Sequence, residues 1–332
     1  MWSAVAPLQI EVHLTPADIA AALREDVRLG LTSDPKRIPP RWHYDERGGE
    51  LFDRITQLEE YYPTRREREI LEARAGEIAE LSGADTLIEL GAGSSAKTRL
   101  LLDALAAHGT LRRYAPFDVS EEVLRASGAR LIAEYPQITV HGIVGDFHDH
   151  LGLLPQGGRR MIAFLGGTIG NLFPAERADL LQTIADGMQP GDSFLLGADL
   201  IKDRARLELA YDDPGGVTAA FSLNVLVRIN RELGADFDVE QFRHDAVWDA
   251  ANEWMELGLL SLRPQLVLVP ELEIAAPFRQ GEKFHTEISA KFRPDGIRAE
   301  LAAAGLDTVR FWTDPAGDFA LVLAAKPAQS GQ

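Results

Sequence analysis

The sequence of 332 residues has no cysteine, which excludes disulfide bridges, thiolate metal sites and cysteine nucleophiles. It also has no excess of basic residues: 34 Lys and Arg stand against 51 Asp and Glu, and the formal net charge is -17. This charge repels phosphate backbones and anionic lipid headgroups, so we expect neither nucleic acid nor a membrane as a partner. Apolar runs of the roughly 20 residues needed to span a bilayer are absent as well.

The first residues contain no basic segment ahead of an apolar stretch, so we expect no signal peptide and a cytoplasmic protein. Hydrophobic residues make up 45% of the sequence and charged residues 26%, which are values typical of globular proteins. The length allows about two domains. Residues 327–332 form a polar tail that we expect to be frayed, and we expect the folded protein to be a monomer.

Apolar periodicity predicts helices over residues 16–31, 49–58 and 64–81, the last of them opened by Thr64 as N-cap. Residues 37–41 contain paired prolines and should form an extended connector. Further along, short apolar runs alternate with helical segments, which predicts a parallel sheet covered by helices on both faces. The strands are expected at 86–90, 113–117, 138–144, 161–165 and 193–198, and the helices at 96–107, 120–135 with Ser120 as cap, and 174–188.

This regular alternation ends after Asp199. The later elements are expected to be helices at 217–233 and 239–242, antiparallel strands within 254–269 and 271–275, a helix at 294–304, and a hairpin of 306–312 with 318–325. A parallel sheet closed by such a hairpin is the order expected of class I, Rossmann-like methyltransferases. We therefore expect a methyltransferase domain of residues 65–200 plus 291–326, and a second, α+β domain of residues 1–64 plus the insertion 201–290.

A glycine-rich turn, Glu89-Leu90-Gly91-Ala92-Gly93-Ser94-Ser95, separates the first predicted strand of the sheet from the helix that follows. Gly91 and Gly93 have no Cβ atom, so their backbone can approach a ligand at which the helix N–H groups point. Two kinds of cofactor fit this spacing: S-adenosylmethionine, or a dinucleotide, because Ala96 takes the third place of the dinucleotide fingerprint. A tight turn without a ligand satisfies the spacing too.

Acidic residues at the ends of the next two predicted strands favour S-adenosylmethionine. Asp118, a candidate ligand of the ribose, lies farther from Gly91 than the roughly 20 residues typical of a dinucleotide site. Asp146 can accept a hydrogen bond from the adenine amino group while the ring of Phe147 lies nearby. The run Gly166-Gly167-Thr168-Ile169-Gly170-Asn171 follows the fourth strand, where substrate contacts belong. Each acid by itself could equally be a helix cap.

Several separated motifs, in one order over residues 23–325, strongly resemble the histidine Nα-methyltransferases of ergothioneine biosynthesis. These motifs are Tyr44-Asp45-Glu46-Arg47-Gly48, Glu60-Tyr61-Tyr62-Pro63-Thr64-Arg65, Gly167-Thr168-Ile169-Gly170-Asn171-Leu172, Ala210-Tyr211-Asp212-Asp213, Lys291-Phe292-Arg293-Pro294 and Trp312-Thr313-Asp314-Pro315. The resemblance implies a class I methyltransferase domain with a second, substrate-binding domain. It also implies three successive methylations of L-histidine to its trimethyl betaine, hercynine.

For the substrate, the resemblance implies that Tyr61 and Tyr211 hold the carboxylate. Asn171 would bind the amino group, with Tyr44 assisting through water. These groups suit the ligand chemically, because hydroxyls and an amide complement a carboxylate and an amine.

The resemblance further implies that Glu287 and Ser289 hold the imidazole of the substrate. The residues it implies for S-adenosylmethionine are Gly91, Lys97, Asp118, Asp146 and Phe147. Methyl transfer needs an in-line approach of the amine to the sulfonium methyl, so alignment and desolvation are the main contributions of the protein. We assign no catalytic base and propose bulk water, reached through Tyr44, as the proton acceptor.

Two features of the sequence limit these expectations. His141, His148 and His150 lack metal-ligand spacing, so we expect no metal. Leu257 stands near the imidazole where methionine is expected in relatives, which leaves a different amino-acid substrate open. An NAD-type oxidoreductase and an amino-acid-sensing module that has kept the fold are the remaining alternatives.

Overall fold

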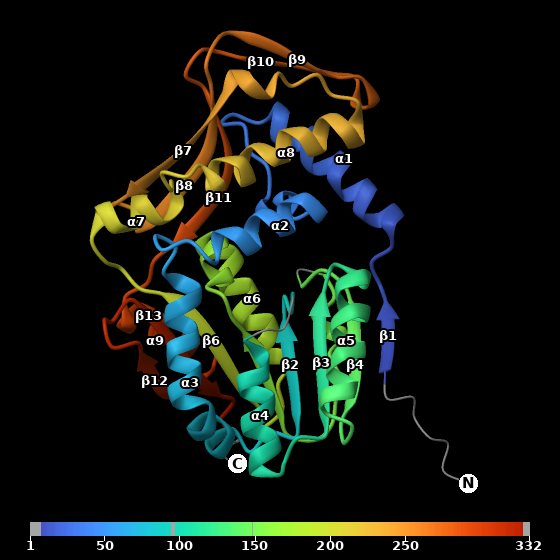
Figure 1. Ribbon diagram of the computed structural model, residues 1–332, viewed down its shortest axis with the longest axis vertical. Coiled ribbons are helices and arrows are strands. Elements are labelled where there is room, and N and C mark those ends of the chain that lie inside the picture. The colour runs from blue at the N-terminus through green and yellow to red at the C-terminus, as the bar shows by residue number, and fades with distance from the viewer. Residues whose placement is uncertain (1–7, 94–96, 148, 328–332) are drawn as a thin grey trace. The chain divides into compact units, whose positions relative to one another are not determined.

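The computed structural model describes residues 8–93, 97–147 and 149–327. The chain divides into two compact units, drawn in Figure 1. Unit 1 contains Met1–Thr15, Arg65–Leu200 and Phe292–Gln332, and unit 2 contains Pro16–Thr64 and Ile201–Lys291. Within the described residues, no helix combines the length and the apolar character needed to cross a membrane.

Unit 1 is built on a sheet of eight strands in the order β1-β4-β3-β2-β5-β6-β13-β12 (Figure 1). The first six strands are parallel, and β13 and β12 are antiparallel to their neighbours. Their bounds are β1 Leu8–Val12, β2 Thr86–Leu90, β3 Arg113–Asp118, β4 Thr139–Val144, β5 Arg160–Phe164, β6 Ser193–Asp199, β12 Asp307–Thr313 and β13 Phe319–Ala325. Every residue of β2, β5 and β6 is buried, which is why these strands are mostly apolar in the sequence.

The strand order reverses between β2 and β5, where successive crossovers run in opposite directions along the sheet. In open α/β sheets, ligands bind outside the carboxyl ends of the strands at this point. The strands and helices predicted for this part of the sequence are confirmed to within a few residues. Ser120 is confirmed as the cap of α5, since its hydroxyl accepts a hydrogen bond from the N–H of Val123.

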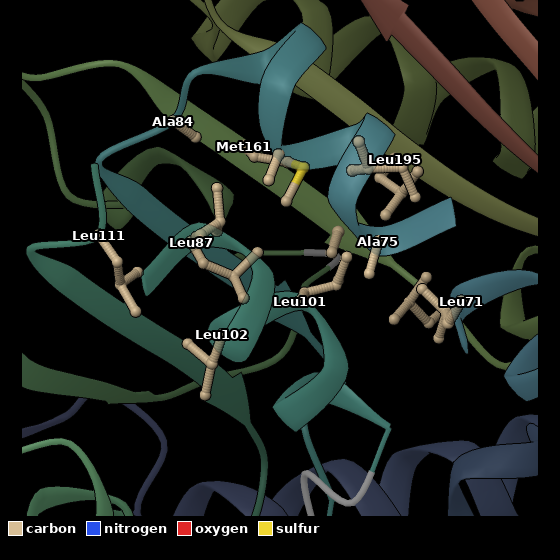
Figure 2. Packing of buried hydrophobic residues seen from close by; sticks show 14 of the residues in the cluster. Leu71, Ala75, Ala84, Leu87, Leu101, Leu102, Leu111, Met161 and Leu195 are labelled. Carbon is tan, nitrogen blue, oxygen red and sulfur yellow. The ribbon is translucent and has the colours of Figure 1, made fainter. Parts of the chain in front are cut away.

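Helices α3, α4 and α5 of unit 1 contribute to one apolar core against the sheet. In Figure 2, Leu71 of α3 and Leu101 of α4 lie over Leu87 of β2 and Met161 of β5. All four side chains are buried, so helix and sheet exclude water from each other. The helical segments are α3 Pro63–Ser82, α4 Thr98–His108, α5 Glu121–Glu134, α6 Pro174–Gly187, α9 Pro294–Ala303 and the 3-10 turns η2 Leu151–Leu153 and η3 Thr168–Asn171.

Two predictions about the helix starts need comment. The prediction that Thr64 caps α3 is wrong, because the helix already begins at Pro63. Proline suits the first helical position, since its fixed φ is helical and the missing N–H would have no partner there. The helix predicted to begin at residue 96 begins at Thr98 among the described residues, and residues 94–96 lie outside them.

Strand β1 was not predicted, and residues 8–15 belong to unit 1 rather than to a domain of residues 1–64 with the insertion. β1 pairs in parallel with β4 at the edge of the sheet. Two glycines make room for it: a Cβ added to Gly128 would lie 2.8 Å from Leu8 Cδ1, and one added to Gly142 would lie 2.6 Å from Ile10 Cδ1. Such a long-range fit leaves no periodic pattern in the sequence.

Unit 2 combines helices with two small antiparallel sheets, β11-β8-β7 and β10-β9. Its core joins the buried faces of α1 and α8 to both sheets, with Val27, Val225, Phe237 and Phe284 among its residues. The elements are α1 Pro16–Thr32, η1 Pro40–His43, α2 Glu46–Ile55, α7 Arg204–Tyr211, α8 Val217–Leu233, η4 Val239–Gln241, β7 Phe242–Asp249, β8 Trp254–Ser261, β9 Gln265–Val269, η5 Pro270–Leu272, β10 Ile274–Phe278 and β11 Lys283–Ala290.

Sequence reasoning was less accurate for this unit. The helix predicted at 239–242 is a single 3-10 turn that leads into β7, and the strand predicted at 271–275 is η5 followed by β10. Residues 40 and 41, the end of the expected extended connector 37–41, instead begin the turn η1. Of the eight residues of β7, only Phe242 is both apolar and buried, so tertiary contacts rather than the local pattern determine its conformation.

Candidate active site

The glycine turn of unit 1 follows β2 at the carboxyl edge of the sheet. Gly91 and Gly93 have φ angles of 70° and 48°, a left-handed conformation that favours glycine. The N–H of Gly91 donates to the carbonyl of Phe117 over 2.8 Å, which ties the turn to β3. A Cβ built on either glycine would meet no heavy atom within 4 Å, so open space lies in front of both. Ser94 and Ser95 lie outside the described residues.

Asp118, the last residue of β3, is fixed by backbone N–H groups. Its two carboxylate oxygens accept from the N–H of Gly93 and from that of Ser120, each over 3.0 Å. Burial raises the pKa of Asp118 above its usual value, and these backbone hydrogen bonds oppose the rise. The acid thus holds the glycine turn and lies at the edge where a ribose hydroxyl could be bound.

Asp146 and Phe147 follow β4. Asp146 is buried, and its carbonyl accepts from the N–H of His150 over 2.9 Å. The ring of Phe147 meets that of Phe164, at the end of β5, edge to face with 5.6 Å between centroids. An acceptor and an aromatic ring therefore lie side by side beyond the carboxyl end of β4, and their contact with an adenine stays a prediction.

Lys97 is held by a buried acid that sequence reasoning missed. Glu67 of α3 is fully buried, forms an ion pair with Lys97, and accepts from the N–H of Gly166 over 2.7 Å. One carboxylate thereby links α3, the residue before α4 and the loop after β5. Its place three and four residues before the buried Ile70 and Leu71, on the apolar face of α3, is the pattern that could have revealed it.

A second buried acid lies within the sheet. Glu89 of β2 accepts from the hydroxyls of Thr98 and Tyr114, each over 2.5 Å. Burial raises the pKa of Glu89 to about 7, although both hydroxyls and Lys97 oppose the rise. These bonds hold the start of α4 next to the strand that leads into the glycine turn.

Asn171 also belongs to unit 1. It ends η3, which follows the left-handed Gly166 and Gly167 with φ angles of 80° and 70°. The asparagine side chain is half-buried. Unit 1 therefore contains all five residues expected to bind the cofactor, together with the residue expected to bind the amine.

Unit 2 brings together the other predicted site residues. The rings of Tyr61 and Tyr211 are both buried and meet edge to face, 6.0 Å apart. Tyr44 meets Phe221 edge to face at 5.3 Å, and Phe52 lies 5.5 Å from Tyr44. These five rings form an aromatic group, to which the helical α2, α7 and α8 and the segments beside them contribute.

Glu287 and Ser289 lie on β11 beside this aromatic group. Burial raises the pKa of Glu287 to about 7, which the positive charge of Lys291 partly offsets. The same Glu287 raises the pKa of the Tyr44 hydroxyl, to which loss of solvent contributes more. Leu257 pairs with Glu287 across the sheet, so the residue that departs from the expected methionine is the direct neighbour of the acid.

The hydroxyls of Tyr211 and Ser289 are 2.8 Å apart, and both accept a hydrogen bond from the buried cation of Lys291. Lys291 Nζ donates to each of them over 2.7 Å, and its side chain is only 3% exposed. Sequence reasoning found Lys291 only as part of a motif and gave it no role. No local pattern could have indicated a role for Lys291, because its contact joins the end of β11 to the distant α7.

The described residues contain no group of three or more His, Asp or Glu that could hold a metal ion. His141 is bonded instead to Glu11 of β1 over 2.8 Å, and His150 lies at the backbone of Asp146. His148 of the predicted histidine set lies outside the described residues.

Comparison with known proteins gives a consistent result. The family model described as "Histidine-specific methyltransferase, SAM-dependent" matches residues 23–326. A Mycolicibacterium smegmatis protein named histidine N-alpha-methyltransferase is 54% identical, covering 96% of this chain and 99% of that protein. A Mycobacterium tuberculosis protein of the same name is 56% identical over 92% of this chain and 95% of its own length.

A longer fungal relative carries the same region. Ergothioneine biosynthesis protein 1 of Neurospora crassa is 31% identical over 97% of this chain, which spans 38% of that protein. The strand order of unit 1, with its final antiparallel hairpin, is that of the class I S-adenosylmethionine-dependent methyltransferase fold. Together with the match over nearly the whole sequence, this shows that the chain belongs to the family of histidine-specific, S-adenosylmethionine-dependent methyltransferases.

Proposed function

We propose that the protein methylates the α-amino group of L-histidine three times with S-adenosylmethionine, producing hercynine for ergothioneine biosynthesis. The observation that carries the proposal is the set Tyr61, Tyr211, Glu287 and Ser289 in one unit of a chain that is more than half identical to relatives named histidine N-alpha-methyltransferase. Hydroxyls and a carboxylate are the complements of the carboxylate and imidazole of histidine.

For the cofactor, we propose that Gly91, Lys97, Asp118, Asp146 and Phe147 hold S-adenosylmethionine. The open space before the left-handed glycines, the acid that ends β3, and the acid and ring that follow β4 are consistent with its methionine, ribose and adenine parts. When bound, S-adenosylmethionine supplies an electrophilic sulfonium methyl group.

For the substrate, Glu287 would accept the imidazole N–H, with Ser289 as its second polar contact. Tyr61 and Tyr211 would donate to the carboxylate, and Asn171 would bind the amine. The role of unit 2 in this proposal is to fix both ends of the amino acid, so that the amine is aligned and desolvated. That role makes unit 2 the substrate-binding domain.

The amine must lose its proton before each transfer. Tyr44 stays neutral, because desolvation and Glu287 raise its pKa well above the usual value. A neutral hydroxyl both accepts and donates, so Tyr44 would pass the proton toward water rather than act as a phenolate base. The fixed positive charge of the trimethylated product is compatible with the rings of Tyr44, Tyr61 and Phe221.

Mass spectrometry of L-histidine incubated with the protein and S-adenosylmethionine tests the proposal. We expect products heavier by one, two and three methyl groups, with the third accumulating. An unchanged mass would refute the proposal. Other amino acids with aromatic side chains serve as parallel substrates, because Leu257 beside Glu287 leaves the preference of the pocket to be measured. A higher melting temperature with NADH but not with S-adenosylhomocysteine would favour the oxidoreductase alternative instead.

We further propose that the protein acts as a monomer in the cytoplasm. The proposal rests on the absence of cysteine and on the net charge of -17, which favours separated chains in solution. Light scattering should give the mass of one chain, and twice that mass would contradict the monomer.

A further inference from the structure

Arg177 is a buried positive charge of unit 1 to which the proposed function gives no role. It is the fourth residue of α6, and its side chain is only 9% exposed. The partial positive charge of a helix N-terminus disfavours a cation near it, and burial of a guanidinium group costs further free energy. The stability of α6 by itself therefore does not explain an arginine at this position.

Two groups from outside α6 hold the guanidinium group of Arg177. Its Nε and Nη2 donate to the two carboxylate oxygens of Glu300 in α9, over 3.2 Å and 2.9 Å. The guanidinium carbon lies 5.1 Å from the centre of the Phe292 ring. A two-point contact with a carboxylate fixes the plane of a guanidinium group, and the ring adds a cation–π contact. The third nitrogen, Nη1, is thereby fixed in direction.

The group that Nη1 reaches is the backbone directly after Asn171. Nη1 donates to the carbonyl of Leu172 over 2.8 Å, and Leu172 is itself buried. The backbone N–H of Arg177 donates to the next carbonyl, that of Phe173, over 2.9 Å. Arg177 thus holds two successive carbonyl groups of the segment that follows Asn171, the last residue of η3.

The opposite end of this loop, residues 166–172, is also held by a buried charge. The N–H of Gly166 donates to the carboxylate of Glu67 over 2.7 Å. The first residue of the loop is therefore fixed by an acid and the last by a cation. Asn171 is the direct neighbour of Leu172, so its place depends on the contact made by Arg177.

We infer that Arg177 is a positioning residue for Asn171: by holding the carbonyl of Leu172, it fixes the asparagine amide where the amine of the substrate is bound. This inference rests on the proposed function, since it requires that Asn171 binds an amine. It extends that function by naming Glu300 and Phe292 as the groups that orient Arg177 for this purpose.

The test compares L-histidine with imidazolepropionate, in which hydrogen replaces the amino group, by calorimetry in the presence of saturating S-adenosylhomocysteine. The ratio of the two dissociation constants measures the preference for the amine, and the wild type should bind histidine more tightly. In Arg177→Met this ratio should fall by about fivefold or more, whereas the affinity for imidazolepropionate should change by less than about threefold. A role confined to stability would not change the ratio.

Two further variants test the geometry of the contact. Arg177→Lys keeps the charge but lacks the planar fork that donates to Glu300 and Leu172 together, so the ratio should stay reduced. In Asn171→Ala the ratio should already be low, and adding Arg177→Met should lower it little further, because both residues act on one contact. Independent, fully additive losses would contradict the inference.

Arg99→Met is the matched control. Arg99 of α4 also joins two helices of unit 1 by a two-point contact, with the carboxylate of Glu134 in α5 over 2.8 Å and 2.9 Å. Within the described part of the chain, it bonds to no residue of the loop 166–172. Its loss should leave the ratio unchanged. An unchanged ratio in Arg177→Met, or an equal loss of affinity for both ligands, overturns the inference.

Glu300→Ala keeps the test decisive where Arg177→Met does not fold. The side chain of Glu300 is 36% exposed, and its removal leaves Arg177 in place without its two acceptors. The ratio should then fall by about twofold or more, and an unchanged ratio in this folded variant overturns the inference. Failure of the proposed function has a different result, since a wild type that binds neither ligand and methylates no histidine refutes that function itself.

Discussion

At the scale of single residues, the ionisation of Glu287 is the property that links stability to the site. Burial raises the pKa of this carboxyl from 4.5 to about 7. The folded protein therefore holds a proton that the unfolded chain has released between about pH 4.5 and pH 7. Stability falls as the pH rises through this window, because the unfolded state binds fewer protons than the folded state. A residue whose ionisation lowers the stability of the ligand-free protein is expected at a binding site, where the bound ligand compensates its buried charge.

The variant Glu287→Gln should separate the effect of this ionisation on stability from the role of the carboxylate in binding histidine. Glutamine cannot ionise, so relative to wild type the melting temperature of the variant should be higher at pH 8, and the difference should shrink towards pH 5. The affinity for histidine at pH 8 should fall by about 10- to 100-fold, since the charged acceptor is lost. Calorimetry with S-adenosylhomocysteine is the control and should be unaffected. A variant that is less stable than wild type at pH 8 would contradict the assigned ionisation.

At the scale of elements, a few hydrogen bonds and one ion pair position the loops at the carboxyl edge of the sheet. The glycine turn after β2 is tied to β3 twice, through the carbonyl of Phe117 and through the carboxylate of Asp118. Glu67 ties α3 to the loop after β5 and to Lys97. The strands provide a rigid base, and these few hydrogen bonds determine where the loop backbone lies.

Gly91→Ala tests the turn. With φ at 70°, alanine would be strained by about 1–2 kcal/mol, and its methyl group would enter the open space in front of the turn. We expect a lower melting temperature and at least a 10-fold weaker affinity for S-adenosylhomocysteine by calorimetry. Gly76→Ala in α3 is the matched control: it has free space without a positive φ, so it should stabilise the protein by about 0.5–1 kcal/mol and leave the affinity unchanged.

Glu67→Gln tests the buried ion pair of Glu67 with Lys97. The amide oxygen can still accept from Gly166, but the ion pair with Lys97 is lost. If that pair positions the lysine for the cofactor, the affinity for S-adenosylhomocysteine should fall by about 5- to 20-fold, and adding Lys97→Met should cost little more, because the two residues act as one. Glu69→Gln, on the exposed side of the same helix, should change nothing. Fully additive losses in the double variant would refute the coupling.

At the scale of the whole molecule, the chain is divided into two units. Each unit has its own apolar core, and each was assembled from segments that are distant in the sequence. In the proposed function, unit 1 binds the methyl donor and unit 2 fixes the ends of the amino acid. This division predicts which backbone amides each ligand protects.

Hydrogen exchange measures that division. S-adenosylhomocysteine should slow exchange in the segments that follow β2, β3 and β4, which include Gly93 and Ser120. Histidine, added to the protein with S-adenosylhomocysteine, should slow exchange at the end of α7 and along β11. Protection by histidine confined to unit 1 would contradict the assignment of substrate binding to unit 2.

The sequence by itself was sufficient for most of unit 1. Buried parallel strands are mostly apolar runs, and a strand followed by Gly91-Ala92-Gly93 and a helix is a local pattern. Asp118 and Asp146 could be named as candidates for the same reason, since an acid at the end of an apolar run is visible without any tertiary contact. The resemblance supplied the residues of unit 2, because no periodicity distinguishes Glu287 from a solvated residue of an alternating strand.

Only the tertiary structure decided the features that depend on distant residues. β1 joins the sheet because Gly128 and Gly142 leave space for its side chains. Glu67 is a buried partner of Lys97 rather than one more charge on an Arg- and Glu-rich helix, and Lys291 is a buried donor to two hydroxyls. Hydrogen bonding between segments far apart in the chain is a property of the packed molecule, so a local pattern can place Glu67 on the apolar face of α3 but cannot name the partners of Glu67 or Lys291.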